Sequence, residues 1–109
     1  MHAEIVRNLG FNLPRIKVKV YGSLREVLIK PEISLQLERE DETVGSVVRV
    51  LIERFGERLK NELIDPKTGE LSAAYQIFVD GKHISLLGGL DSKLKENNVV
   101  EILYPVAGG

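Results

Sequence analysis

The chain has 109 residues, of which 43% are hydrophobic and 28% charged, enough for one domain with a single buried core. Lysine and arginine number 15 and aspartate and glutamate 16, and a net charge of -1 disfavours nucleic-acid binding through phosphate contacts. Cysteine is absent, which excludes disulfide bonds, thiolate zinc sites and a cysteine nucleophile. No apolar run approaches the roughly 20 residues of a membrane-spanning helix, and residues 1–6 do not resemble a signal peptide. We therefore expect a cytoplasmic domain that binds neither nucleic acid nor a membrane.

Residues 1–13 show no clean periodicity and end before Pro14, so we interpret them as an N-terminal extension. The extension is either loosely attached or folded against the domain as a short helix or strand. Apolar and polar residues then alternate over residues 16–21, which predicts a strand with one buried face. A short turn over residues 24–28 and a second alternating strand over residues 33–37 follow.

The clearest helix signal begins at Thr43, a good N-cap residue. The apolar residues after it follow the i, i+3, i+4, i+7 rule and form one stripe: Val44, Val47, Val48, Leu51, Ile52 and Phe55. Gly56 is typical of a helix end, and Leu59 with Leu63 indicates one or two further helical turns. A loop is predicted over residues 65–69.

The next strand is expected over residues 75–79, followed by a hairpin at residues 80–81 (Asp-Gly) and a return strand over residues 82–84. We expect Asp91 to cap a single turn that carries Leu90 and Leu94 into the core, before a last strand over residues 99–104.

This order of elements predicts an α+β fold in which one main helix packs on one face of a mixed sheet of four to five strands. The domain spans residues 14–104, and residues 105–109 form a flexible C-terminal tail.

Conventional catalytic and ligand-binding motifs are missing from the sequence. No strand leads into a glycine-rich phosphate loop, and His2 and His83 have no partners at metal-ligand spacing. The acidic stretch over residues 38–42 (EREDE) is better interpreted as a solvated loop than as a cation site. We expect no metal site and no catalysis by this chain alone.

The C-terminal tail is the exception, because it ends in two glycines directly after a core strand. Five residues reach roughly 17 Å when extended, and glycine adopts backbone angles that other residues avoid. Such a thread can enter the active-site channel of another protein, although a frayed chain end would have the same composition.

Three apolar side chains are expected on the sheet face opposite the core: Tyr21, Phe78 and Leu103. If they cluster, they form a docking patch for a partner. The alternative is that a turn or the N-terminal extension covers them.

Three stretches carry a resemblance to a known family: residues 16–26 (IKVKVYGSLRE), residues 43–56 and residues 90–109. From Pro14 to the end, the chain resembles the ubiquitin-like β-grasp sulfur carriers, most of all the small subunit of molybdopterin synthase (the molybdopterin-converting factor). The resemblance implies a β-grasp fold.

The resemblance also implies a function for the tail. A partner of the ubiquitin-activating type would consume ATP to adenylate the Gly109 carboxylate, and sulfur would then replace AMP to give a thiocarboxylate. Gly108 gives clearance for entry, and Ala107 and Val106 complete the segment that fills the partner's channel. The large subunit of molybdopterin synthase would use the sulfur, and the chain itself would bind no cofactor.

Three alternatives stay open at this point. The chain is a protein modifier joined through Gly109 to lysines of its targets, a carrier for thiamine synthesis, or a β-grasp interaction module whose tail has no function. A carrier can also serve as a modifier, so the first alternative does not exclude the sulfur-carrier hypothesis.

Overall fold

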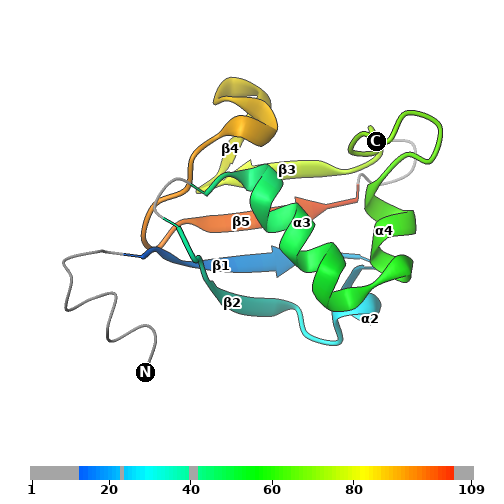
Figure 1. The fold of residues 1–109 in the computed structure, drawn as a ribbon, viewed down its shortest axis with the longest axis horizontal. Coiled ribbons are helices and arrows are strands. Elements are labelled where there is room, and N and C mark those ends of the chain that lie inside the picture. Colours follow the sequence, from blue (N-terminus) through cyan, green and yellow to red (C-terminus); the bar gives the residue numbers. More distant parts are fainter. Residues whose placement is uncertain (1–12, 23, 40–41, 105–109) are drawn as a thin grey trace.

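The computed structural model describes residues 13–22, 24–39 and 42–104 and contains a five-stranded mixed sheet in the order β2-β1-β5-β3-β4 (Figure 1). The strands are β1 (Arg15–Val20), β2 (Glu32–Gln36), β3 (Gln76–Val79), β4 (Lys82–His83) and β5 (Val99–Leu103). The helices are α2 (Leu24–Leu28), α3 (Val44–Phe55), α4 (Glu57–Leu63) and two 3-10 turns, η1 (Ile84–Leu86) and η2 (Gly89–Asp91). The strand and helix predictions are confirmed, with small shifts of their bounds.

The core lies between the sheet and α3, which crosses one face of the sheet (Figure 1). Alternation along β1 buries Ile16, Val18 and Val20 and leaves Arg15 and Lys17 exposed. The apolar stripe of α3 meets these strands and buries Val44, Val47, Val48 and Leu51. The predicted two-layer α+β fold is therefore confirmed.

The first and last strands are neighbours in the middle of the sheet and run parallel. Val18 lies opposite Val100 and Val20 opposite Ile102, and none of these four side chains is more than 2% exposed. The other three pairs of neighbouring strands are antiparallel. Burial on this scale makes the β1–β5 pair the centre of the core.

Local residues define both ends of α3. The Thr43 hydroxyl accepts from the Ser46 backbone N–H at 3.2 Å, and the Thr43 N–H donates to the Ser46 hydroxyl at 3.3 Å. This reciprocal pair is a capping box, with serine in the usual place of glutamate. At the other end, Gly56 has a φ of 82° and ends α3. The chain continues directly into α4, whose side chains Leu59 and Leu63 are buried.

The Asp80–Gly81 turn has positive φ at both residues, 49° and 84°, as a type I′ hairpin requires. The Asp80 carboxylate also accepts from the Val99 backbone N–H at 2.8 Å, which ties the hairpin to the start of β5. The return strand is one residue shorter than predicted because Ile84 already begins η1.

The prediction for the turn around Asp91 is half wrong. Leu94 is buried as expected, but Leu90 is 37% exposed. The hydroxyl of Ser92, rather than Asp91, holds the turn, since it accepts from the Gly88 N–H and donates to the Gly89 carbonyl. In this arrangement η2 lies over the first turn of α3, where a Cβ at Gly45 would be 3.2 Å from the Leu90 carbonyl oxygen.

Ile29, directly after α2, has a φ of 70°. A non-glycine residue pays roughly 1–2 kcal/mol in this left-handed region, and β-branched residues are the least suited to it. The other non-glycine residues with positive φ in the described part of the chain are Asp80 and Asn97, types that tolerate this conformation. The Ile29 side chain is 85% exposed, so burial does not offset the strain.

Both predicted terminal segments fall largely outside the described residues, which exclude 1–12 of the extension and all of 105–109. The described chain begins at Leu13, and the buried Pro14 accepts a backbone hydrogen bond from Leu37. In the described part of the chain, none of the helices has the length and apolar character needed to span a membrane.

Removing the N-cap of α3 should destabilise the domain. We expect Thr43→Ala to lower the free energy of unfolding by about 1 kcal/mol, because the Ser46 N–H loses its acceptor. Thr43→Ser keeps the hydroxyl and serves as the control, with a much smaller loss. Denaturant unfolding measures both, and equal losses would show that the cap contributes nothing.

Candidate functional site

The chain leaves the domain from the middle of the sheet. β5 has β1 on one side and β3 on the other, and Tyr104, the last described residue, follows it directly. The predicted tail residues, Val106, Ala107, Gly108 and Gly109, lie outside the described residues, so their role stays a prediction. The structure does define the point from which they start.

Tyr104 is held at that point by an aromatic contact. Its ring packs edge-on against Tyr75, with ring centroids 5.1 Å apart and an angle of 73° between the planes. Tyr75 is buried, and its hydroxyl donates to the Glu62 carboxylate on α4 at 2.6 Å. The last residue before the tail is therefore anchored to the sheet and, through Tyr75, to a helix.

The structure places the three predicted docking residues on the open face, which we define as the side of the sheet away from α3. Phe78 lies opposite Glu101, and Leu103 opposite Gln76, so both side chains project to this face. Tyr21 follows β1 in the same alternation and donates its hydroxyl to Glu101 at 2.7 Å. Tyr21 is exposed, and Phe78 and Leu103 are half-buried.

Glu101 lies between two of these aromatic residues and affects one of them electrostatically. The hydrogen bond to its carboxylate raises the pKa of Tyr21 above the ordinary value of 10.0. Partial desolvation and the negative charges of Glu101 and Glu32 act in the same direction. On the far side of Glu101, the Phe78 ring contacts His83 edge-on at 5.2 Å.

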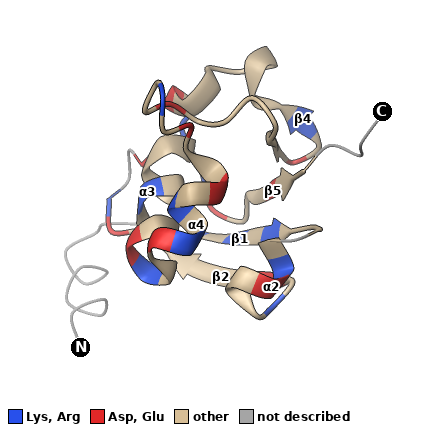
Figure 2. Ribbon diagram, turned by 90° about the vertical axis from the view of Figure 1, so that its right-hand side faces the viewer, with Lys and Arg blue, Asp and Glu red and all other residues tan. Residues whose placement is uncertain are grey.

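Charge on the open face is mixed. Lys17 and Lys19 on β1 lie 3.7 and 4.0 Å from the Glu32 carboxylate on β2. Such exposed pairs contribute little stability, and they leave the face neither strongly basic nor strongly acidic. Acidic and basic residues also lie side by side on α3 and α4 (Figure 2).

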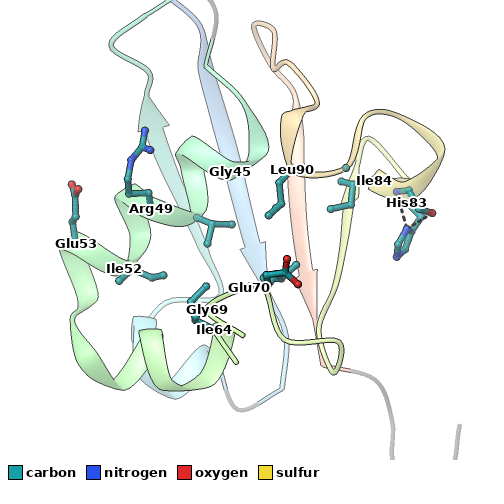
Figure 3. A pocket seen from close by; sticks show the side chains of 14 residues that line it. Gly45, Arg49, Ile52, Glu53, Ile64, Gly69, Glu70, His83, Ile84 and Leu90 are labelled. Atoms are coloured by element: carbon teal, nitrogen blue, oxygen red, sulfur yellow. Dashed lines mark hydrogen bonds between the residues drawn. The ribbon is translucent and has the colours of Figure 1, made fainter. Parts of the chain in front are cut away.

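A separate pocket of about 720 Å³ lies between α3 and the segments around residues 69–71 and 83–90 (Figure 3). Leu90, which the sequence predicted to be in the core, lines it together with Val48, Ile52 and Ile84. Sequence periodicity did not reveal this pocket, because it arises from the placement of η2 over α3.

His83 also lines the pocket, but both of its ring nitrogens are engaged. Nδ1 accepts from the Ser85 backbone N–H at 3.1 Å, so Nε2 carries the proton and donates to the Gln76 side chain. Across residues 13–22, 24–39 and 42–104, no three histidine, aspartate or glutamate side chains are grouped as a metal site.

Comparisons with known proteins agree on a family. The model of the ThiS family matches residues 18–109. A protein of Archaeoglobus fulgidus, named as a candidate sulfur carrier, is 31% identical over 94 residues, which cover 86% of this chain and 98% of the relative.

Solved structures show the same fold. Small archaeal modifier protein 1 from Methanosarcina acetivorans has a TM-score of 0.76 and 29% identity, over 91% of this chain and 100% of that one. A candidate molybdopterin converting factor subunit 1 from Pyrococcus furiosus has a TM-score of 0.68 and 25% identity, over 85% and 99%. The ubiquitin-like β-grasp expectation is confirmed.

The bond between Tyr21 and Glu101 can be tested by titration. We expect Glu101→Gln to lower the pKa of Tyr21 toward its ordinary value, because the charged acceptor is lost while the side chain keeps its size. Ultraviolet titration in a background with Tyr75→Phe and Tyr104→Phe isolates Tyr21. An unchanged midpoint would contradict the assignment of the shift to Glu101.

Proposed function

Because the chain belongs to the ThiS family, we propose that it is a sulfur carrier whose reacting group is the C-terminal carboxylate of Gly109. The match of the family model to residues 18–109, which includes the terminal glycines, is the observation that carries the proposal. The similarity to the Archaeoglobus protein supports it.

The chemistry requires an activated carboxylate, since a carboxylate is a poor electrophile. An oxygen of the Gly109 carboxylate attacks the α-phosphorus of ATP, pyrophosphate leaves, and an acyl-adenylate forms. A hydrosulfide equivalent then attacks the carbonyl carbon and displaces AMP, which leaves a thiocarboxylate. The chain contains no cysteine, so the sulfur comes from a donor or partner protein.

The domain contributes position rather than catalysis. Its tail follows Tyr104, which is packed on Tyr75, and the five tail residues span roughly 17 Å when extended. Gly108 and Gly109 carry no side chain that would obstruct a narrow channel. Ordering each tail residue costs about 1–2 kcal/mol, which contacts along the partner's channel must offset.

For the pathway, we propose molybdopterin synthesis, with this chain as the small subunit of the synthase. Similarity to the Pyrococcus molybdopterin converting factor supports this assignment. The partners are then a cytoplasmic adenylating enzyme of the ubiquitin-activating type, which consumes the ATP, and the large subunit of the synthase. There the thiocarboxylate sulfur attacks a carbon of a pterin precursor and displaces an oxygen substituent. Water then hydrolyses the resulting thioester, which leaves the sulfur on the pterin and returns the Gly109 carboxylate.

Similarity to the Methanosarcina modifier favours a second candidate, a protein modifier. Both functions share the acyl-adenylate of Gly109 and separate afterwards. In the modifier, a lysine amine of a target ends up bonded to the Gly109 carbonyl carbon as an amide.

The decisive measurement is the intact mass of the chain after incubation with an adenylating enzyme, ATP and a sulfur donor. We expect a mass increase equal to one oxygen replaced by sulfur. One residue added after Gly109, or deletion of Gly109, should abolish this change and leave thermal stability nearly unchanged, because the core ends before the tail. Sulfur transfer in either variant would disprove the proposal.

The same reaction distinguishes the two candidates. ATP-dependent adducts of higher mass, without the sulfur product, would favour the modifier. If neither product forms, the tail has no such chemistry and the domain is an interaction module.

The open face provides a second test. We expect Phe78→Asp to weaken binding to the adenylating enzyme or the large subunit by about tenfold or more, because an apolar contact is replaced by a charge beside Glu101. Leu87→Asp is the control, because Leu87 is exposed and lies directly after η1, outside the sheet. Circular dichroism checks that both variants fold, and an unchanged dissociation constant for Phe78→Asp would remove the docking proposal.

A further inference from the structure

Ile29 combines backbone strain with nearly full exposure. Its φ of 70° belongs to the region that favours glycine, and its side chain is 85% exposed. Nothing in the described part of the domain offsets this strain by burying the side chain. A residue with a strained backbone, whose side chain adds no stability to the folded domain, is a candidate for a role in recognition.

The backbone around Ile29 is held firmly. Leu28, directly before it, is buried at 3% exposure. Two residues later, the Pro31 carbonyl accepts from the Val20 backbone N–H at 2.9 Å, which joins the loop to β1. A β-branched side chain has few rotamers, so Ile29 would lose little conformational entropy on binding.

The Ile29 loop lies at the end of the sheet from which the tail leaves. Val20, which bonds to Pro31, is opposite Ile102, and Ile102 is two residues before Tyr104. A Cβ at Gly22, in the turn before α2, would be 3.9 Å from the Tyr104 Cβ. Figure 1 shows α2 and the ends of β1 and β5 on the same side of the molecule.

Other exposed apolar residues gather at this end. Tyr21 is 39% and Tyr104 50% exposed, so with Ile29 they make up three of the six large apolar side chains that are exposed in the described residues. The other three belong to the segment from η1 to η2, beyond β4.

We propose that Ile29 is a contact residue for the enzyme that adenylates Gly109, which presents an apolar pocket beside the opening of its active-site channel. This inference rests on the proposed function. A channel that takes up a tail of roughly 17 Å brings its rim against the residues that surround Tyr104, and Ile29 projects from the neighbouring loop. The strained backbone fixes the position of the side chain for this contact.

The test compares Ile29→Asn and Ile29→Gly with the wild-type full chain. Both residues tolerate positive φ, so we expect the fold to be retained and Ile29→Gly to raise Tm by about 4 °C. We expect the dissociation constant for the adenylating enzyme, measured by calorimetry, to rise about tenfold or more in both variants. Leu86→Asn is the matched control, because Leu86 is 77% exposed on η1, and it should leave binding unchanged.

Two results would overturn the inference. Wild-type affinity of Ile29→Asn would show that the enzyme does not contact this side chain. A fall in Tm for the same variant would show that another part of the chain packs on Ile29.

Intact mass separates this inference from the proposed function. If the wild-type chain gains sulfur and Ile29→Asn gains it with the same affinity and rate, the Ile29 contact alone fails. If the wild-type chain binds the enzyme through Ile29 but gains no sulfur, the proposed sulfur chemistry alone fails. If the wild-type chain does not bind the enzyme, both fail.

Discussion

The parallel pairing of β1 with β5 places the first and last strands of the domain side by side in the middle of the sheet. Their inward side chains, such as Val18 and Val100, are fully buried under α3. The order of the sheet follows from this pair, since β2 extends it on one side and β3 and β4 on the other. Because parallel strands end at the same edge, the chain enters the domain at one end and leaves it at the other.

The proposed function assigns different tasks to the domain and to the C-terminal tail. Contacts of Tyr104 with Tyr75, and of Tyr75 with Glu62, fix where the tail begins. The proposed chemistry belongs to Gly109, and under the same proposal a partner recognises the chain by surfaces of the domain. In that proposal, recognition and reaction are linked only through residues 105–109, so a variant is expected to change one and leave the other intact.

Sequence alone predicted the elements whose signals are local. Alternating apolar and polar residues predicted β1, and apolar residues at helical spacing predicted α3. The Asp80–Gly81 dipeptide predicted the hairpin. Each of these patterns follows from the geometry of one element. The position of Leu90 and the strain at Ile29 could not be predicted, because both depend on how distant segments pack. For the site, alternation correctly placed Tyr21, Phe78 and Leu103, whose docking role stays a prediction, on one face of the sheet. The hydrogen bond from Tyr21 to Glu101 could not be predicted, because it depends on the β1–β5 pairing.

β4 has only two residues, Lys82 and His83, before the chain turns into η1. An unpaired strand edge is a template on which other chains can add strands and aggregate, and a short, charged edge offers little backbone for such growth. At the opposite edge, β2 carries the exposed Glu32 and Gln36. The β4 edge therefore gives neighbouring copies of the chain little backbone on which to extend the sheet.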